Sequence, residues 1–304
     1  MIVRRRMHWV RMLFVWRGSV VYTILPQLGI ATAIAVAVTL TQGHVFGLKI
    51  GLTAVPFTLL GITLAIFLGF RNTVSYERYW EARKLWGSVL NESRSATRQS
   101  LSLCDADAGA QREFVYGLIA FVHALRHQLR GTESSQQTAG LLPPDWQQRV
   151  AGSRFPPAMV LLCLGERIAA WRRRGELSDI AAVAIDRSLG RLGDALGGCE
   201  RIASTPIPFS YSVLLHRTIY LYAFLLPFGL VDLIGDMTPL VVLFVSYTFF
   251  ALDALAEEIQ EPFGLEPNDL ALDAISLTVE TALREMLGET SLPPAAQPLN
   301  FVLS

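Results

Sequence analysis

Cysteine, charge and catalytic motifs are all scarce in this chain. The 304 residues include three cysteines, Cys104, Cys163 and Cys199, without a Cys-x-x-Cys pair and without a histidine at ligand spacing. We therefore expect buried thiols in a reducing compartment rather than a disulfide framework or a structural zinc site. The formal net charge is zero, so nucleic-acid binding has no electrostatic support.

The motifs of the common enzyme classes are also missing. The sequence has no nucleophile elbow, P-loop, His-Glu-x-x-His zinc motif or dinucleotide fingerprint. His123 and His127 share one helix face at i, i+4, which could ligate a metal, but no acidic or thiol partner is near them in sequence. Core or interface positions are the favoured interpretation of both histidines. We expect no catalytic site and no enzyme.

The hydrophobic content is high, at 52%, and charged residues make up only 17% of the chain. This balance is typical of a protein with both membrane and cytosolic parts. The run from Leu52 to Phe70 contains no charged residue and is long enough to cross the hydrocarbon core of a bilayer as one helix. Arg71 then marks the expected membrane edge.

Apolar runs and polar stretches divide the chain into segments. Residues 1–19 form a basic and aromatic interfacial segment, with Arg4, Arg5, Arg6, Arg11 and Arg17 as its arginines. Residues 20–71 and 211–256 are predicted transmembrane hairpins. In the second hairpin the apolar runs Thr218–Val231 and Met237–Leu252 are short, so either flanking residues complete each span or the helices are partly buried in protein.

The remaining segments are predicted to be cytosolic. Residues 72–210 show helical periodicity without strand alternation, and Ser178 is the expected N-cap of a helix that ends before the proline-rich residues 205–209. Residues 257–289 comprise an acidic turn and a helix, and residues 290–304 are a tail with little structural signal. Basic residues cluster after the second span, which predicts that both chain ends are cytoplasmic.

The second span carries two parallel stripes. Gly61, Ala65 and Gly69 repeat at i, i+4, i+8, a spacing of small residues that lets two membrane helices approach closely. One position further on, Ile62, Ile66 and Phe70 form a bulky apolar stripe. Composition favours lipid contact for the bulky stripe, and a pore lining is the alternative.

Three motifs resemble the bacterial branch of the bestrophin channel family. They are FLGFRNTVSYERYWEARKLWG after the second span, ERIASTPIPFSY before the third and SYTFFALDALAEEIQEPFG after the fourth, in the family's order and spacing. The resemblance implies an all-α membrane protein that forms a homopentamer, with four transmembrane helices per subunit and a helical cytosolic domain.

The resemblance also assigns roles to particular residues. The positions that match the hydrophobic neck of the pore are Ile62, Ile66 and Phe70, which favours the pore lining, with Gly61, Ala65 and Gly69 packing helices behind it. A second, cytosolic constriction maps onto Ile180.

Animal members of the family bind calcium in an acidic run after Pro-Phe-Gly. Here only Glu266 and Asp269 keep carboxylates in matching places, so they are the candidate ligands of a divalent cation. A solvated charged turn is the alternative, and no other cofactor is expected.

The sequence-based hypothesis is a pentameric channel of the bacterial inner membrane, in contact with membrane lipids, that passes monovalent ions. Similarity to the bacterial branch favours cations such as sodium, and an anion channel for chloride with the same architecture is the alternative. A hydrophobic neck does not select a sign, which depends on rings of charge that face the axis. A membrane-anchored scaffold without conduction is a further alternative.

Overall fold

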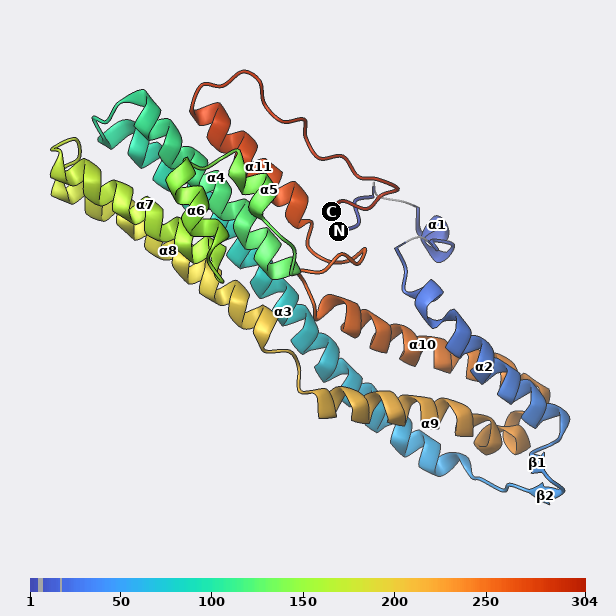
Figure 1. Cartoon of the computed structure of the whole chain (residues 1–304). Coiled ribbons are helices and arrows are strands. Elements are labelled where there is room, and N and C mark those ends of the chain that lie inside the picture. The colour runs from blue at the N-terminus through green and yellow to red at the C-terminus, as the bar shows by residue number, and fades with distance from the viewer. Residues whose placement is uncertain (5–7, 17) are drawn as a thin grey trace. The chain divides into compact units, whose positions relative to one another are not determined.

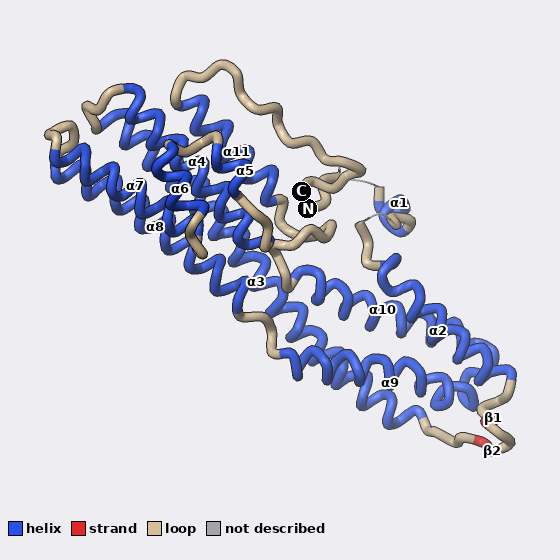
Figure 2. The backbone as a smooth tube through the Cα atoms, in the orientation of Figure 1, coloured by secondary structure: helices blue, strands red, loops and turns tan. Residues whose placement is uncertain are grey.

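A computed structural model shows a mostly helical chain, with strands confined to one short hairpin among the described residues (Figure 1 and Figure 2). The structure describes residues 1–4, 8–16 and 18–304; Arg5, Arg6 and Arg17 of the predicted interfacial segment lie outside the described residues. Unit 1 contains Met1–Val3, Trp80–Thr205 and Pro262–Ser304, and unit 2 contains Arg4–Tyr79 and Pro206–Glu261.

Unit 2 holds the apolar helices. Its elements are α1 (Trp9–Leu13), α2 (Val21–Leu40), β1 (His44–Val45), β2 (Leu48–Lys49), the first part of α3 (Ala54–Leu103), α9 (Phe209–Ile234), the 3-10 helix η1 (Gly235–Met237) and α10 (Thr238–Ile259). Three helical stretches are long and apolar enough to cross a membrane: Val21–Leu40, Ala54–Leu103 and Phe209–Ile259. The last stretch includes both α9 and α10, which η1 joins.

The two short apolar runs lie within longer helical stretches. Helix α9 has 26 residues and α10 has 22, so each is longer than the run of uncharged residues at its centre. An α-helix of this length rises about 30 Å or more, which matches the hydrocarbon core. The described parts of the chain therefore contain four apolar helices of spanning length, counting the start of α3.

The link between α2 and α3 has more structure than its sequence indicates. His44 pairs with Lys49 and Val45 pairs with Leu48 across a two-residue turn. Phe46 and Gly47 both have positive φ, 51° and 80°, as a type I′ turn requires. The sequence shows no alternation here because two-residue strands are too short to produce it.

The core of unit 2 forms where α2 packs against α9 and α10. Ala31 and Ala35 of α2 are fully buried, and their small side chains let the helix backbones approach closely. Val242 and Phe250 of α10 and Ile219 of α9 fill the same core. At one end of the unit, Lys49 Nζ lies 2.9 Å from Asp232 Oδ1.

Unit 1 is a bundle of longer and shorter helices. It contains the second part of α3 with α4 (Ala108–Arg130), α5 (Ser135–Ala139), α6 (Pro144–Ala151), α7 (Pro156–Arg173), α8 (Asp179–Ser204) and α11 (Leu272–Met286). Phe114, Phe121 and Trp171 are buried between α4 and its neighbours. A Cβ on Gly117 would lie 2.9 Å from side-chain atoms of Leu164, so glycine permits the close approach of α4 and α7.

Several helix boundaries in unit 1 follow from local chemistry. The Ser178 side chain accepts a hydrogen bond from Ala181 N at 3.2 Å, which confirms the predicted N-cap of α8. Helix α8 ends at Ser204, just before two prolines, as expected. The polar stretch after Arg130, in contrast, contains the short helix α5, which the sequence does not indicate.

The two histidines of α4 bind different partners. His123 Nε2 lies 2.9 Å from Glu280 Oε2 of α11, and His127 Nε2 lies 2.9 Å from Gln137 Oε1 of α5. They do not converge on one point, which agrees with core or interface positions and not with a metal pair.

The C-terminal tail is paired with the start of the chain. Ile2 forms an antiparallel bridge with Val302, and Leu303 N donates to Met1 O at 2.8 Å. The pairing uses backbone groups, so side-chain patterns gave no sign of it.

Candidate ion pathway

One face of α3 is buried inside unit 2. Leu64, Leu68, Arg71 and Ser75 recur at intervals of three and four residues, and all are buried. Phe57 begins the same face, and its ring lies 6.0 Å from that of Tyr222 in α9. This face attaches the start of α3 to the rest of unit 2.

The bulky stripe lies on the opposite face of α3. Successive residues of an α-helix are about 100° apart around its axis, so Ile66 lies about 180° from the midpoint between Leu64 and Leu68. Ile62, Ile66 and Phe70 are 57%, 53% and 62% exposed. Within the described residues, the chain's own helices leave this stripe uncovered.

The small residues of the second span have different surroundings. A Cβ on Gly61 would lie 2.9 Å from the Tyr222 hydroxyl oxygen, so Gly61 packs against α9 of the same chain. Ala65 is exposed, and a Cβ on Gly69 would meet no described atom within 4 Å. Packing against another subunit therefore stays a prediction for Ala65 and Gly69.

Arg71, which the sequence places at the membrane edge, is buried among the helices of unit 2. Only 3% of its surface is exposed, and its Nη1 forms an ion pair with Asp253 Oδ1 of α10. Asp253 Oδ2 also lies 3.1 Å from His216 Nδ1 of α9. This cluster joins three helices. The sequence could not reveal it, because its members are about 40 to 180 positions apart.

Ile180 lies in the first turn of α8 and is 86% exposed, whereas nearby Leu177 is buried. An apolar side chain at this exposure in unit 1 is open to contact by another molecule or by ions. Its role as a second constriction stays a prediction.

The acidic turn uses one of its carboxylates to hold its own backbone. Asp269 is buried, and its Oδ2 accepts a hydrogen bond from Glu266 N at 2.7 Å, while Asp269 N donates to Glu266 O at 3.0 Å. In the part of the chain that the structure describes, no group of three or more His, Cys, Asp or Glu side chains could hold a metal. A divalent cation at Glu266 and Asp269 stays a prediction.

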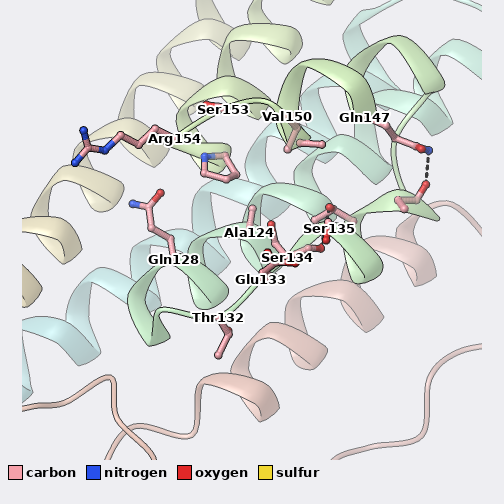
Figure 3. A pocket seen from close by; sticks show the side chains of 14 residues that line it. Ala124, Gln128, Thr132, Glu133, Ser134, Ser135, Gln147, Val150, Ser153 and Arg154 are labelled. Atoms are coloured by element: carbon pink, nitrogen blue, oxygen red, sulfur yellow. Dashed lines mark hydrogen bonds between the residues drawn. The ribbon is translucent and has the colours of Figure 1, made fainter.

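Unit 1 also contains a polar cavity of about 620 Å³ between α4, α5 and α6 (Figure 3). Gln128, Ser134, Ser135 and Arg154 are among its lining residues. None of the predicted site residues lines it, so it is separate from the neck and from Ile180.

Comparison with known proteins identifies the family. Residues 1–285 match the model of the family described as bacterial/fungal bestrophin protein. A voltage-dependent anion channel-forming protein of Ralstonia nicotianae is 49% identical over 305 residues, covering 100% of both chains. The voltage-dependent anion channel-forming protein YneE of Escherichia coli is 44% identical over 298 residues, covering 98% of both chains.

A solved structure agrees with these matches. The crystal structure of a bacterial bestrophin homologue from Klebsiella pneumoniae has a TM-score of 0.85 and 43% identity, covering 88% of this chain and 100% of that chain. The names of the curated relatives fit the anion alternative better than the sodium expectation. The chain belongs to the bacterial and fungal bestrophin family, and it is a membrane ion channel and not an enzyme.

Proposed function

We propose that five copies of this chain form a channel that passes monovalent anions, with chloride as the principal ion, through a neck lined by Ile62, Ile66 and Phe70. The observation that carries the proposal is the exposed apolar stripe on the face of α3 opposite its buried face. The names of the relatives support anions, and sodium is the weaker alternative.

The neck would control conduction through its diameter and through its loss or retention of water. Rings of Ile and Phe side chains offer an ion no hydrogen bond, so a narrow neck favours loss of water and closes without a moving plug. Ala65 and Gly69 flank the stripe and carry little side-chain volume, which would let α3 helices of neighbouring subunits pack closely behind the lining. Ile180 would supply a second apolar constriction in unit 1.

We place the channel in the bacterial inner membrane, with both chain ends and unit 1 in the cytoplasm. Arg78, Arg83 and Lys84 follow the apolar start of α3, and basic residues near the end of a span favour the cytoplasmic side. Trp9, Leu13 and Phe14 of the N-terminal segment are exposed, which suits an interfacial position.

The test is conduction by purified protein in planar bilayers. We expect current that reverses near the chloride equilibrium potential across a sodium chloride gradient. Reversal near the sodium potential would retain the channel and invert its selectivity. A chain that stays monomeric and conducts no ions would instead support the anchored scaffold.

Replacement of Ile66 tests the neck. Ile66→Ala removes apolar volume from each subunit, and we expect single-channel conductance to rise at least about twofold because the constriction widens and holds water more readily. Ile180→Ala should act separately.

Leu60→Ala is the matched control for Ile66→Ala. Leu60 is also an apolar residue of α3, 44% exposed, and it lies about 120° from Ile66 around the helix. Its replacement should leave the conductance unchanged. Equal conductance of intact assemblies of Ile66→Ala and wild type would remove Ile66 from the neck.

A further inference from the structure

The stripe on α3 continues beyond Phe70 within unit 2. Helix α3 is unbroken from Ala54 to Leu103, so the phase of the stripe can be followed along it. Thr73 and Glu77 come one and two turns after Phe70, and both are exposed. At about 100° per residue, Glu77 lies within about 20° of both Ile66 and Phe70 around the helix.

Helix α3 has three charged residues within unit 2, Arg71, Glu77 and Arg78. Glu77 differs from the two arginines in its contacts. Arg71 is buried with Asp253, and Arg78 Nε donates to Gln260 O at 3.1 Å. Among the described residues, no hydrogen bond or ion pair is found for the Glu77 carboxylate, and its side chain lies on the exposed face of α3.

We infer that Glu77 is a charge-selecting residue of this channel, one that attracts cations to the neck and opposes anions. The inference rests on the proposed function, since five subunits with Ile62, Ile66 and Phe70 at the axis would bring five Glu77 side chains to the same pathway. Glu77 lies seven positions after Phe70, which is about 10 Å along the helix. That separation is about one Debye length at 0.1 M salt.

The electrostatic consequence has a definite sign. A pathway lined by carboxylates concentrates cations and depletes anions next to the neck. Glu77 would therefore reduce the preference for anions that other parts of the channel produce.

The experiment compares Glu77→Gln, Glu77→Asp and Glu77→Lys with wild type in planar bilayers under a sodium chloride gradient. We expect Glu77→Gln to raise the chloride-to-sodium permeability ratio about tenfold at low ionic strength, and Glu77→Lys to raise it further. Glu77→Asp keeps the charge and should keep the wild-type ratio. Glu285→Gln removes an exposed carboxylate from α11 and is the control for net charge.

Salt dependence separates a charge effect from a change in structure. The Debye length falls to about 3 Å at 1 M salt, so the difference between Glu77→Gln and wild type should shrink there. Wild type alone gives a second test that does not depend on the assembly of a variant. Screening of Glu77 should raise the chloride-to-sodium permeability ratio of wild type as the ionic strength increases.

Two results would overturn the inference. A permeability ratio that is the same in wild type, Glu77→Gln and Glu77→Lys, with normal currents, would overturn the role of Glu77 and leave the proposed function intact. Verified pentamers of wild type that conduct no ions under any condition tested would overturn both.

Discussion

Single charged residues in unit 1 are held by specific partners, and Glu280 is a clear example. Its Oε2 lies 2.9 Å from His123 Nε2 and its Oε1 lies 3.1 Å from Arg284 Nη1. The hydrogen bond from His123 and the charge of Arg284 hold the pKa of Glu280 below its ordinary value of 4.5, against the opposing effect of burial. The ionised form therefore stabilises the folded state.

This shift predicts a loss of stability in acid. A carboxylate whose pKa is lower in the folded state contributes stability above its unfolded pKa, and this contribution is lost as the pH falls through the folded pKa. At pH values below about 4.5, we expect the thermal unfolding temperature of wild type to decrease as the pH falls. That of Glu280→Gln should decrease less steeply. Circular dichroism in detergent between pH 7 and pH 3 measures both.

The control for this titration is Glu285→Gln, since Glu285 is exposed on the same helix. Its pH profile should match that of wild type. Parallel profiles for Glu280→Gln and wild type would show that ionisation of Glu280 does not contribute to stability.

Helices α3, α9 and α10 are joined by polar contacts as well as apolar packing. The ion pair of Arg71 and Asp253 connects α3 to α10, and His216 of α9 contacts the same carboxylate. Asn72 Nδ2 also donates to Leu252 O at 3.2 Å. A buried ion pair costs desolvation energy, but the loss of one partner costs more, because the other charge stays buried alone.

Removal of one partner of this pair should weaken the packing of these helices. We expect Asp253→Asn to lower the free energy of unfolding by about 3 to 5 kcal/mol, and the double variant Arg71→Met, Asp253→Leu to recover most of it. Thermal denaturation in detergent, with the yield of assembled protein, measures the change.

The pair of Lys49 and Asp232 is the control, because both side chains are about half exposed. Asp232→Asn should change stability by no more than about 1 kcal/mol. Equal decreases in the free energy of unfolding for Asp232→Asn and Asp253→Asn would mean that a buried charge left without its partner costs no more here than an exposed one.

In a single copy of this molecule, the bulky stripe of α3 is not covered by other helices. Ile62, Ile66 and Phe70 are more than half exposed in the described chain, at the level of the membrane-spanning helices. One helix face cannot enclose an axial pathway, so conduction through this stripe requires several copies in a ring. Ring assembly pairs two different faces of neighbouring subunits and closes at a definite number.

The proposed assembly predicts a definite mass. Purified protein in mild detergent should have five times the chain mass of 33.6 kDa once bound detergent is subtracted. Light scattering or native mass spectrometry measures this value. A monomeric protein that keeps its helical content would contradict the proposed neck, whereas a ring of another size would correct only the subunit number.

Local chemistry was sufficient to predict much of this protein. The charge-free run before Arg71 predicted a spanning helix, Ser178 predicted the start of α8 and the prolines after Ser204 predicted its end, because each depends on residues close in sequence. The three motifs indicated the family, since their order and spacing can be compared along the chain. The sequence also marked Ile62, Ile66 and Phe70, but composition alone favoured lipid contact for them.

Tertiary structure alone decided which faces of the helices are used. It buried Arg71 against Asp253, placed Gly61 against Tyr222, and left the face of α3 that carries Ile66, Phe70 and Glu77 exposed. An apolar helix has almost no difference in hydrophobicity between its faces, so its sequence does not indicate its orientation. Contacts between residues far apart in the chain supply that information, because a side chain is buried only where another helix covers it.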